Sequence, residues 1–191
     1  MRRFLLLMAA LAGSVWTASA QKTTAIPILN PKFDMDVLTC SPGSNCGQIG
    51  ITGWIVGPGT GVEKCSATQY PGTPSTGMYV AAVGDTATSG SIMQTLGATV
   101  QANTTYILTV EVGARADYPF TGYLASLMAG NVTVASGNKS TPVGGTFVTE
   151  VVTYESGASP AQLGQPLQIL ITSTGDGQTN IKNVTLTAVS Q

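Results

Sequence analysis

The chain contains no histidine among its 191 residues. This absence excludes the common catalytic triads, in which histidine carries the proton, and the usual catalytic zinc sites, in which it binds the metal. A thiol enzyme would need a base beside its cysteine, and the sequence places none there. The route to catalysis that the composition leaves open is a pair of carboxylates, as glycosidases use.

Charged residues are also scarce, at 9% of the chain, and the basic ones are scattered singly. Nucleic-acid binding depends on clustered Lys and Arg at phosphates, so this class of partner is excluded. Thr, Ser, Gly, Val and Ala dominate instead. This composition favours β-strands with uncharged polar outer faces over helices.

The first twenty residues have the pattern of a secretory signal peptide. Arg2 and Arg3 precede an apolar run that is too short to span a bilayer, and Ala18-Ser19-Ala20 ends it with the small residues that signal peptidase prefers. We expect cleavage before Gln21 and a secreted protein, extracellular or periplasmic, without membrane insertion. An uncleaved anchor is the alternative. The remaining chain has six basic and nine acidic residues, a net charge of −3.

Only three cysteines are present, Cys40, Cys46 and Cys65. Export permits a disulfide, and three cysteines allow three pairings with one free thiol. The segment "CSPGSNC" is a short loop that can close on itself, which favours Cys40–Cys46. A metal site is disfavoured by the spacing and by the absence of histidine.

From Ala25 onward, short runs rich in β-branched and aromatic residues alternate with Gly, Pro, Asn or Asp. In the run after Thr105, Tyr106, Leu108, Val110 and Val112 share one face. Many short strands with regular turns predict one all-β domain over residues 21–191, an antiparallel β-sandwich of jelly-roll type. The expected strands are Ile26–Asn30, Met78–Val83, Ser91–Leu96, Thr105–Ala114, Gly122–Ala129, Val132–Ala135, Phe147–Tyr154, Leu167–Ser173 and Asn180–Val189.

The segment 34–77 reads as irregular. It holds all three cysteines, and "GWIVGPGTG" within it contains three glycines and a proline, which disfavour a regular element. Long segments without structure are usually functional or tied down covalently.

The motifs "PILNPKFD", "ITGWIVGPGTGVE", "GSIMQTLGATVQANTTYILTVEVGAR" and "IKNVTLTAV" occur in an order that resembles the galactose-binding-like jelly-roll domains of secreted proteins. The chain is similar to the bacterial extracellular members of that group and to DUF642-type plant cell-wall proteins. This resemblance covers nearly all of the chain after the signal segment. It implies the same fold and, in many members, carbohydrate binding.

Some members of this group carry a structural calcium ion, for which the resemblance nominates Asn30 and Asp34. The carboxylate expected from the last motif is replaced by Lys182, whose positive charge opposes a cation. We therefore expect no cofactor, with calcium as a minor alternative. In the plainer interpretation, Asn30 and Asp34 satisfy turn amides, and Asp34 pairs with Lys182.

The segment "ARADYPFTGY" offers the best cluster for ligand binding. Sugar recognition uses an aromatic platform with planar polar groups, which Arg115, Asp117, Tyr118 and Phe120 can supply at one sheet edge. Trp54 joins them as a candidate because it lies in a predicted loop, although a core position that plugs one end of the sandwich is favoured for it. A catalytic pair would come from carboxylates that the strand and turn pattern places at solvated positions: Glu63, Asp85, Glu111, Asp117, Glu150, Glu155 and Asp176.

These observations predict a secreted, non-catalytic binding module whose partner is a glycan or another cell-surface component. The first alternative is an adhesion protein that binds another protein through a sheet face. The second is a divergent glycoside hydrolase with two carboxylates in a cleft. The oligomeric state is not indicated by the sequence.

Overall fold

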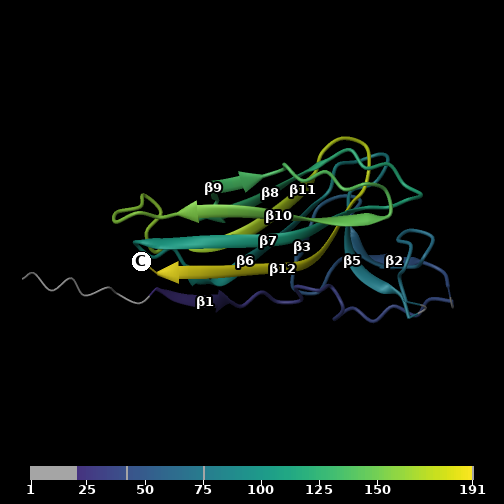
Figure 1. The fold of residues 1–191 in the computed structure, drawn as a ribbon, viewed down its shortest axis with the longest axis horizontal. Coiled ribbons are helices and arrows are strands. Elements are labelled where there is room, and N and C mark those ends of the chain that lie inside the picture. Colours follow the sequence, from purple (N-terminus) through teal and green to yellow (C-terminus); the bar gives the residue numbers. More distant parts are fainter. Residues whose placement is uncertain (1–20, 42, 75, 191) are drawn as a thin grey trace, which may run out of the picture.

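The computed structural model describes residues 21–41, 43–74 and 76–190. Within these ranges the chain forms two antiparallel β-sheets and no helix, which confirms the predicted all-β sandwich of jelly-roll type (Figure 1). The described part of the chain accordingly has no helix that could cross a membrane. The predicted signal segment, residues 1–20, lies outside the described residues.

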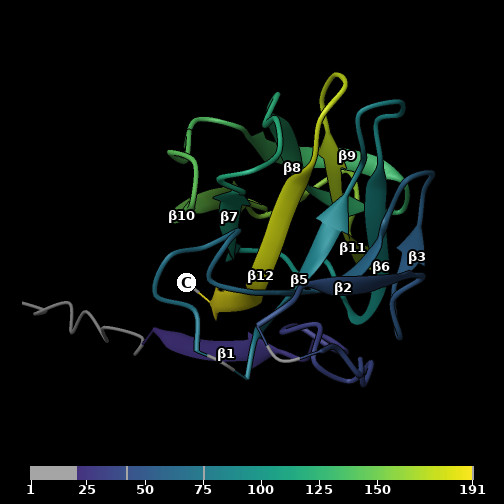
Figure 2. The same cartoon turned by 90° about the vertical axis from the view of Figure 1, so that its right-hand side faces the viewer.

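The large sheet has the strand order β10–β7–β12–β5–β4–β2, and the small sheet has the order β3–β6–β11–β8–β9. β1 and β5 share one edge of β12, β1 at the end of that strand and β5 at its start. Figure 2 shows β12 flanked by β7 and β5. The strands are β1 (Lys22–Ile26), β2 (Cys46–Ile49), β3 (Ile55–Val56), β4 (Gly61–Cys65), β5 (Met78–Val83), β6 (Ser91–Thr99), β7 (Thr104–Ala114), β8 (Tyr123–Ala129), β9 (Val132–Gly137), β10 (Thr146–Glu155), β11 (Pro166–Ser173) and β12 (Thr179–Ser190).

The core lies between the two sheets and follows the alternation read from the sequence. In β7 every second residue from Tyr106 to Val112 is buried, and the intervening residues are partly exposed. β11 contributes Leu167, Ile169 and Ile171, each fully buried. Burying one such aliphatic side chain stabilises the fold by about 1.5–3 kcal/mol, so these faces hold the two sheets together.

Two expectations about the N-terminal half were wrong. The first strand is β1, which ends at Ile26 rather than beginning there, because Pro27 has no N–H to donate to the ladder. The segment 34–77 is not irregular throughout, since it contains β2, β3 and β4. Glycine in β4 is tolerated because Gly61 packs against the backbone of Gln48 on the neighbouring strand, where a Cβ atom would clash.

The disulfide Cys40–Cys46 is confirmed, with a Cα–Cα distance of 5.7 Å, and Cys65 is a buried free thiol. Residues 66–74 and 76–77, hereafter the cover segment, follow β4, and Tyr70 among them packs on the outer face of the large sheet. There Tyr70 packs with Cys65 and Val80 in a second, smaller apolar cluster, away from the space between the sheets. The outer face of the large sheet is therefore partly enclosed.

Candidate functional site

Four residues form a row across the outer face of the large sheet, because each lies opposite the next on a neighbouring strand. Gly61 of β4 pairs with Ala82 of β5, and Ala82 pairs with Asn180 of β12. Asn180 pairs in turn with Gly113 of β7. Residues opposite one another in antiparallel strands point to the same face. Three small residues around one amide make a shallow strip, hereafter the trough.

A depression of about 330 Å³ lies beside the trough. Its lining includes Gly61 and Ala82 from the trough, and Glu63 two residues further along β4. Arg115 and Gln178, just beyond the ends of β7 and β12, complete its polar wall. The volume is at the low end of the range for small-molecule sites, roughly 300–1,000 Å³.

Arg115 organises the polar wall of the depression. Its Nη1 donates to Glu63 Oε1 at 2.7 Å and to the side-chain oxygen of Gln178 at 3.3 Å. Its Nε and Nη2 donate to the two carboxylate oxygens of Asp117 at 2.9 and 2.8 Å. The guanidinium carbon also lies 5.1 Å from the centre of the Tyr118 ring. Arg115 thus bridges two carboxylates and lies against an aromatic face.

The charged groups in this network shift one another's pKa values. The hydrogen bond from Arg115 is the main cause that lowers the pKa of Asp117, to about 2, and a hydrogen bond from Gln69 adds to it. Burial opposes the charge of Arg115, but Asp117 and Glu63 together raise the pKa of its guanidinium. Arg115 and Asp117 therefore carry full charges at neutral pH.

Glu63 is the buried carboxylate of the site, with 6% of its surface exposed. Its Oε1 accepts from Arg115 and, at 3.1 Å, from the Asn45 amide. Among the described residues no hydrogen bond reaches Oε2, and Glu63 lines the depression. A carboxylate fixed by one oxygen keeps the other for a bound molecule.

The cover segment encloses the other end of the trough. Tyr70 stacks on Phe147 of β10, with ring centres 4.4 Å apart and an interplanar angle of 27°. Its hydroxyl donates to Asn180 Oδ1 at 2.8 Å. Burial raises the pKa of the Tyr70 hydroxyl, so it stays protonated as this donor requires. Burial also raises the pKa of the Cys65 thiol, which makes it a poor nucleophile.

Lys182 follows Asn180 by two residues and points to the same face. Its Nζ lies 3.1 Å from Glu111 Oε2 and 4.0 Å from the centre of the Phe147 ring. The Asn183 amide donates to the other oxygen of Glu111 at 3.0 Å. The suggested partner of Lys182, Asp34, is not the residue with which it pairs.

The two residues nominated for calcium lie in different surroundings. Asn30 is buried, and its amide is engaged with the Met35 N–H, the Asp36 carboxylate and the Thr52 carbonyl. Asp34 is exposed and lines one depression together with Lys182. Across the described ranges no three Cys, Asp or Glu side chains come together in a group suited to a metal ion.

Trp54 is a core residue, with 7% of its surface exposed. Its indole N–H donates to the Asn30 carbonyl at 3.2 Å, and its ring lies 5.5 Å from that of Phe33. A buried ring has no free face, so Trp54 is not a ligand platform. The plainer interpretation, in which this ring plugs the core, agrees with the structure.

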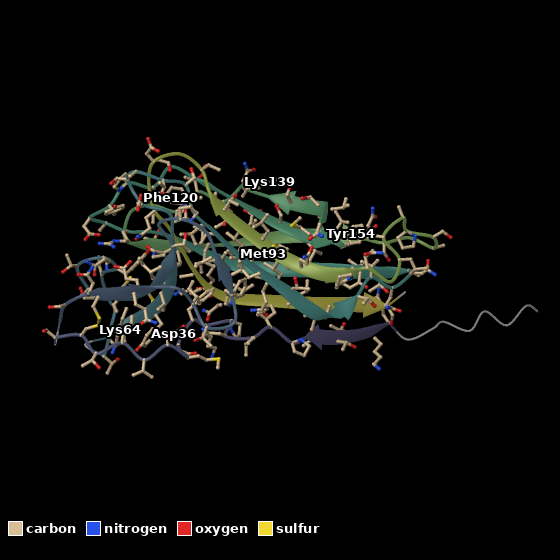
Figure 3. The ribbon with its side chains drawn as sticks, turned by 180° about the vertical axis from the view of Figure 1, so that it is seen from behind. Asp36, Lys64, Met93, Phe120, Lys139 and Tyr154 are labelled. Carbon is tan, nitrogen blue, oxygen red and sulfur yellow. A yellow bond between two sulfur atoms is a disulfide. The ribbon has the colours of Figure 1, made fainter. Side chains whose placement is uncertain are left out.

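Tyr118 and Phe120 are half-buried. The Tyr118 hydroxyl accepts from the Thr86 N–H, and Phe120 packs at a tilt against Tyr123. Phe120 lies near the loop-rich end of the sandwich in Figure 3, and it does not line the depression. Arg115, Asp117 and Tyr118 thus meet in one network, whereas Trp54 and Phe120 lie elsewhere.

The sequence reasoning missed the trough. Asn180 was placed in a strand and given no role, and Glu63 was counted among solvated carboxylates. The strand β4 that carries Glu63 was not predicted, so its register with β5 could not be deduced. The one signal was position, since Asn180 begins the expected strand Asn180–Val189 shortly after the turn residues "TGDGQ".

The model of the HpiC1-like family, described as HpiC1 cyclase, matches residues 24–187. No curated protein matches the chain significantly. A Stig cyclase, Fisc of Fischerella sp. TAU, solved with (3Z)-3-(1-methyl-2-pyrrolidinylidene)-3H-indole, is 26% identical with a TM-score of 0.75 over 87% of this chain and 98% of its own. A cyclase of the same organism, solved with 4-(1H-indol-3-yl)butan-2-one, is 26% identical with a TM-score of 0.73 over 86% and 97%.

The xylan-binding domain CBM22-1 of Paenibacillus barcinonensis Xyn10C is also similar in structure, at 12% identity and a TM-score of 0.53 over 92% of this chain and 99% of its own. At this identity the likeness shows the fold alone. It agrees with the sandwich that the sequence resemblance implied, and no support is found for the DUF642 link.

These matches contradict the expected function. The family model and the two cyclase structures indicate an enzyme, so the prediction of a non-catalytic, carbohydrate-binding module was wrong, as were the adhesion and glycosidase alternatives. The error has a physical origin. A β-sandwich can host binding and catalysis on the same face, and fold alone does not distinguish them.

Proposed function

Because the chain belongs to the HpiC1-like cyclase family, we propose that it is an enzyme that closes a ring within a small molecule, at the depression beside the trough. The single observation that carries the location is Glu63, a buried carboxylate with one oxygen fixed by Arg115 and the other left for a ligand. Carboxylates are rarely buried unless they are paired, so a buried one with an oxygen to spare beside a depression marks a candidate site.

Ring closure within one molecule leaves its composition unchanged, so the enzyme has to stabilise charge and move a proton. In the proposed reaction, an electron-rich aromatic carbon attacks a protonated imine carbon of the same molecule. A carbon–carbon bond forms, the nitrogen becomes a neutral amine, and the positive charge passes to the aromatic ring. The ring carbon then loses its proton, which restores aromaticity.

Glu63 serves both requirements in this proposal. Opposite charges about 4 Å apart attract by about 4 kcal/mol at the effective dielectric of a protein surface, so its carboxylate stabilises the cation before and after bond formation. The oxygen not held by Arg115 then accepts the ring proton, which is general base catalysis. Arg115 and Asn45 fix the carboxylate so that it does not reorganise during the step.

The proposed substrates are aromatic heterocycles with a carbonyl or imine group on a side chain. The compound solved with one Fischerella cyclase is an indole with a ketone on its side chain, and the compound solved with the other is a 3H-indole that carries a nitrogen-containing ring. In this chain the stacked pair Tyr70–Phe147 and the small residues of the trough favour a flat aromatic molecule. We also propose that the enzyme acts outside the cytoplasm, which the signal-like N-terminus and the Cys40–Cys46 disulfide support.

The test is a panel of 3-substituted indoles with imine-bearing side chains, assayed by liquid chromatography and mass spectrometry. Ring closure gives a product of unchanged mass and altered retention. We expect Glu63→Gln to lower kcat roughly 10²–10⁴-fold, which is the usual contribution of general acid–base catalysis. Glu155→Gln, at the exposed end of β10, is the matched control and should keep the full rate. A panel without any ring-closed product would contradict the proposed function.

A further inference from the structure

Asn180 has an unusual place in the trough, because its side chain is fully buried and only half satisfied. It has 0% exposure, and its Oδ1 accepts from the Tyr70 hydroxyl. Its Nδ2 is the one buried side-chain nitrogen or oxygen of the described residues without a hydrogen-bond partner. Exchanging the two amide atoms does not help, since the carbonyl oxygen would then be left without a donor.

A buried hydrogen-bond donor without an acceptor destabilises the folded protein, so such a donor in a native structure calls for a functional explanation. The neighbours of Asn180 suggest that use. On one side Gly113 lies directly beneath the Phe147 ring, and on the other Ala82 leads into the depression that Glu63 lines. The unpaired N–H is therefore placed between an aromatic platform and a buried carboxylate.

Tyr70 currently fills the space above this platform. Its ring stacks on Phe147 and its hydroxyl reaches Asn180, as an aromatic molecule with a polar group would. A cavity of about 450 Å³ lies between the cover segment, Lys64 and the disulfide loop at Cys40, which together line it. The cover segment consequently has space into which it can withdraw without unfolding the sheet.

We propose that Asn180 is a substrate-binding residue that selects for a hydrogen-bond acceptor. When Tyr70 swings away, the aromatic ring of the substrate stacks on Phe147, and its carbonyl oxygen or imine nitrogen accepts from Asn180 Nδ2. Glu63 lies on the opposite side of the bound molecule, where its charge faces the reacting carbon. This inference rests on the proposed function and names the substrate feature that the site recognises.

The experiment compares two probes by isothermal titration calorimetry: 4-(1H-indol-3-yl)butan-2-one and 3-butylindole, which lacks only the ketone oxygen. Wild-type protein should bind the ketone about tenfold more tightly, the effect of one additional hydrogen bond. Asn180→Leu, close to the same size, should abolish this preference and still bind 3-butylindole. Tyr70→Phe is the matched control, because it keeps the stacking ring and removes the hydroxyl that holds the cover closed.

In Tyr70→Phe both probes should bind more tightly by a similar factor, with the preference for the ketone unchanged. A second measurement does not depend on whether Asn180→Leu folds. The ¹⁵N side-chain amide resonance of Asn180 in wild-type protein should shift with the ketone and stay unchanged with 3-butylindole.

Three results would overturn the inference: equal affinities for the two probes in wild-type protein, a ketone preference that survives in Asn180→Leu, or no binding of either probe to wild type and Tyr70→Phe. Each is separate from failure of the proposed function. A ketone preference that depends on Asn180, without ring closure of any substrate, would contradict catalysis alone. Ring closure with an unaltered preference in Asn180→Leu would contradict the role of Asn180 alone.

Discussion

Replacing Arg115 with methionine should destabilise the protein by about 3–5 kcal/mol, the usual cost of removing one partner from a buried ion pair. The Arg115 and Glu63 side chains are 10% and 7% exposed, so the substitution leaves the Glu63 carboxylate in a poorly solvated place with only Asn45 as a partner. The Arg115–Asp117 pair adds little to this cost, because Asp117 is 34% exposed and its charge remains hydrated.

The assay is urea unfolding followed by tryptophan fluorescence. With a slope of about 1–3 kcal/mol per molar urea, a loss of about 3–5 kcal/mol should lower the midpoint by about 1–5 M. The double variant Arg115→Met/Glu63→Gln should recover part of the loss, since it removes the unpaired charge. A midpoint within about 0.3 M of wild type would refute the view that Arg115 and Glu63 form a buried, mutually dependent pair.

Three further predictions concern the same half of the molecule. The pKa of Asp117 in the folded protein, about 2, lies below its ordinary value of 3.8. The ionised carboxylate therefore stabilises the fold above about pH 4, and this stabilisation is lost as the pH falls from about 4 to 2. In Asp117→Asn, the free energy of unfolding should depend less on pH within that window. Replacing both Cys40 and Cys46 with alanine should lower the free energy of unfolding by about 2 kcal/mol, the effect expected for so short a loop. An unchanged melting temperature would contradict a stabilising role for this disulfide. Cys65 should resist a thiol reagent in the native protein and react on unfolding, because burial shields its thiol and raises the pKa of that thiol. Rapid labelling of the native protein would show that the cover segment opens more often than its packing implies.

The β-sandwich was predictable because its strands show a two-residue alternation of apolar and polar side chains. The alternation in β7 and β11 predicted both the strands and their buried faces, which the structure confirms. The disulfide was predictable from a loop short enough to close. β2 and β4 were not, because they are short strands that contain glycine or charged residues, and β3 has only two residues. Pairing with neighbouring strands rather than propensity holds all three.

The site was only partly predictable, because the pairing register of neighbouring strands brings its residues together. Arg115, Asp117 and Tyr118 are close in sequence, and a local reading placed them together. Glu63 and Asn180 come from strands 117 positions apart in the chain, which only the pairing of β4, β5 and β12 unites. The catalytic character was missed because no local motif expresses it and the general resemblance pointed to binding.

The most direct test of the central claim compares two carboxylates of the same outer face, Glu63 and Glu111. Glu111 is held by Lys182 and Asn183 and does not line the depression beside the trough. With an indole substrate that the wild-type protein cyclises, Glu63→Gln should lose roughly 10²–10⁴-fold in kcat, and Glu111→Gln should stay close to the wild-type rate. Equal loss in both variants, or loss in Glu111→Gln alone, would contradict the assignment of catalysis to Glu63.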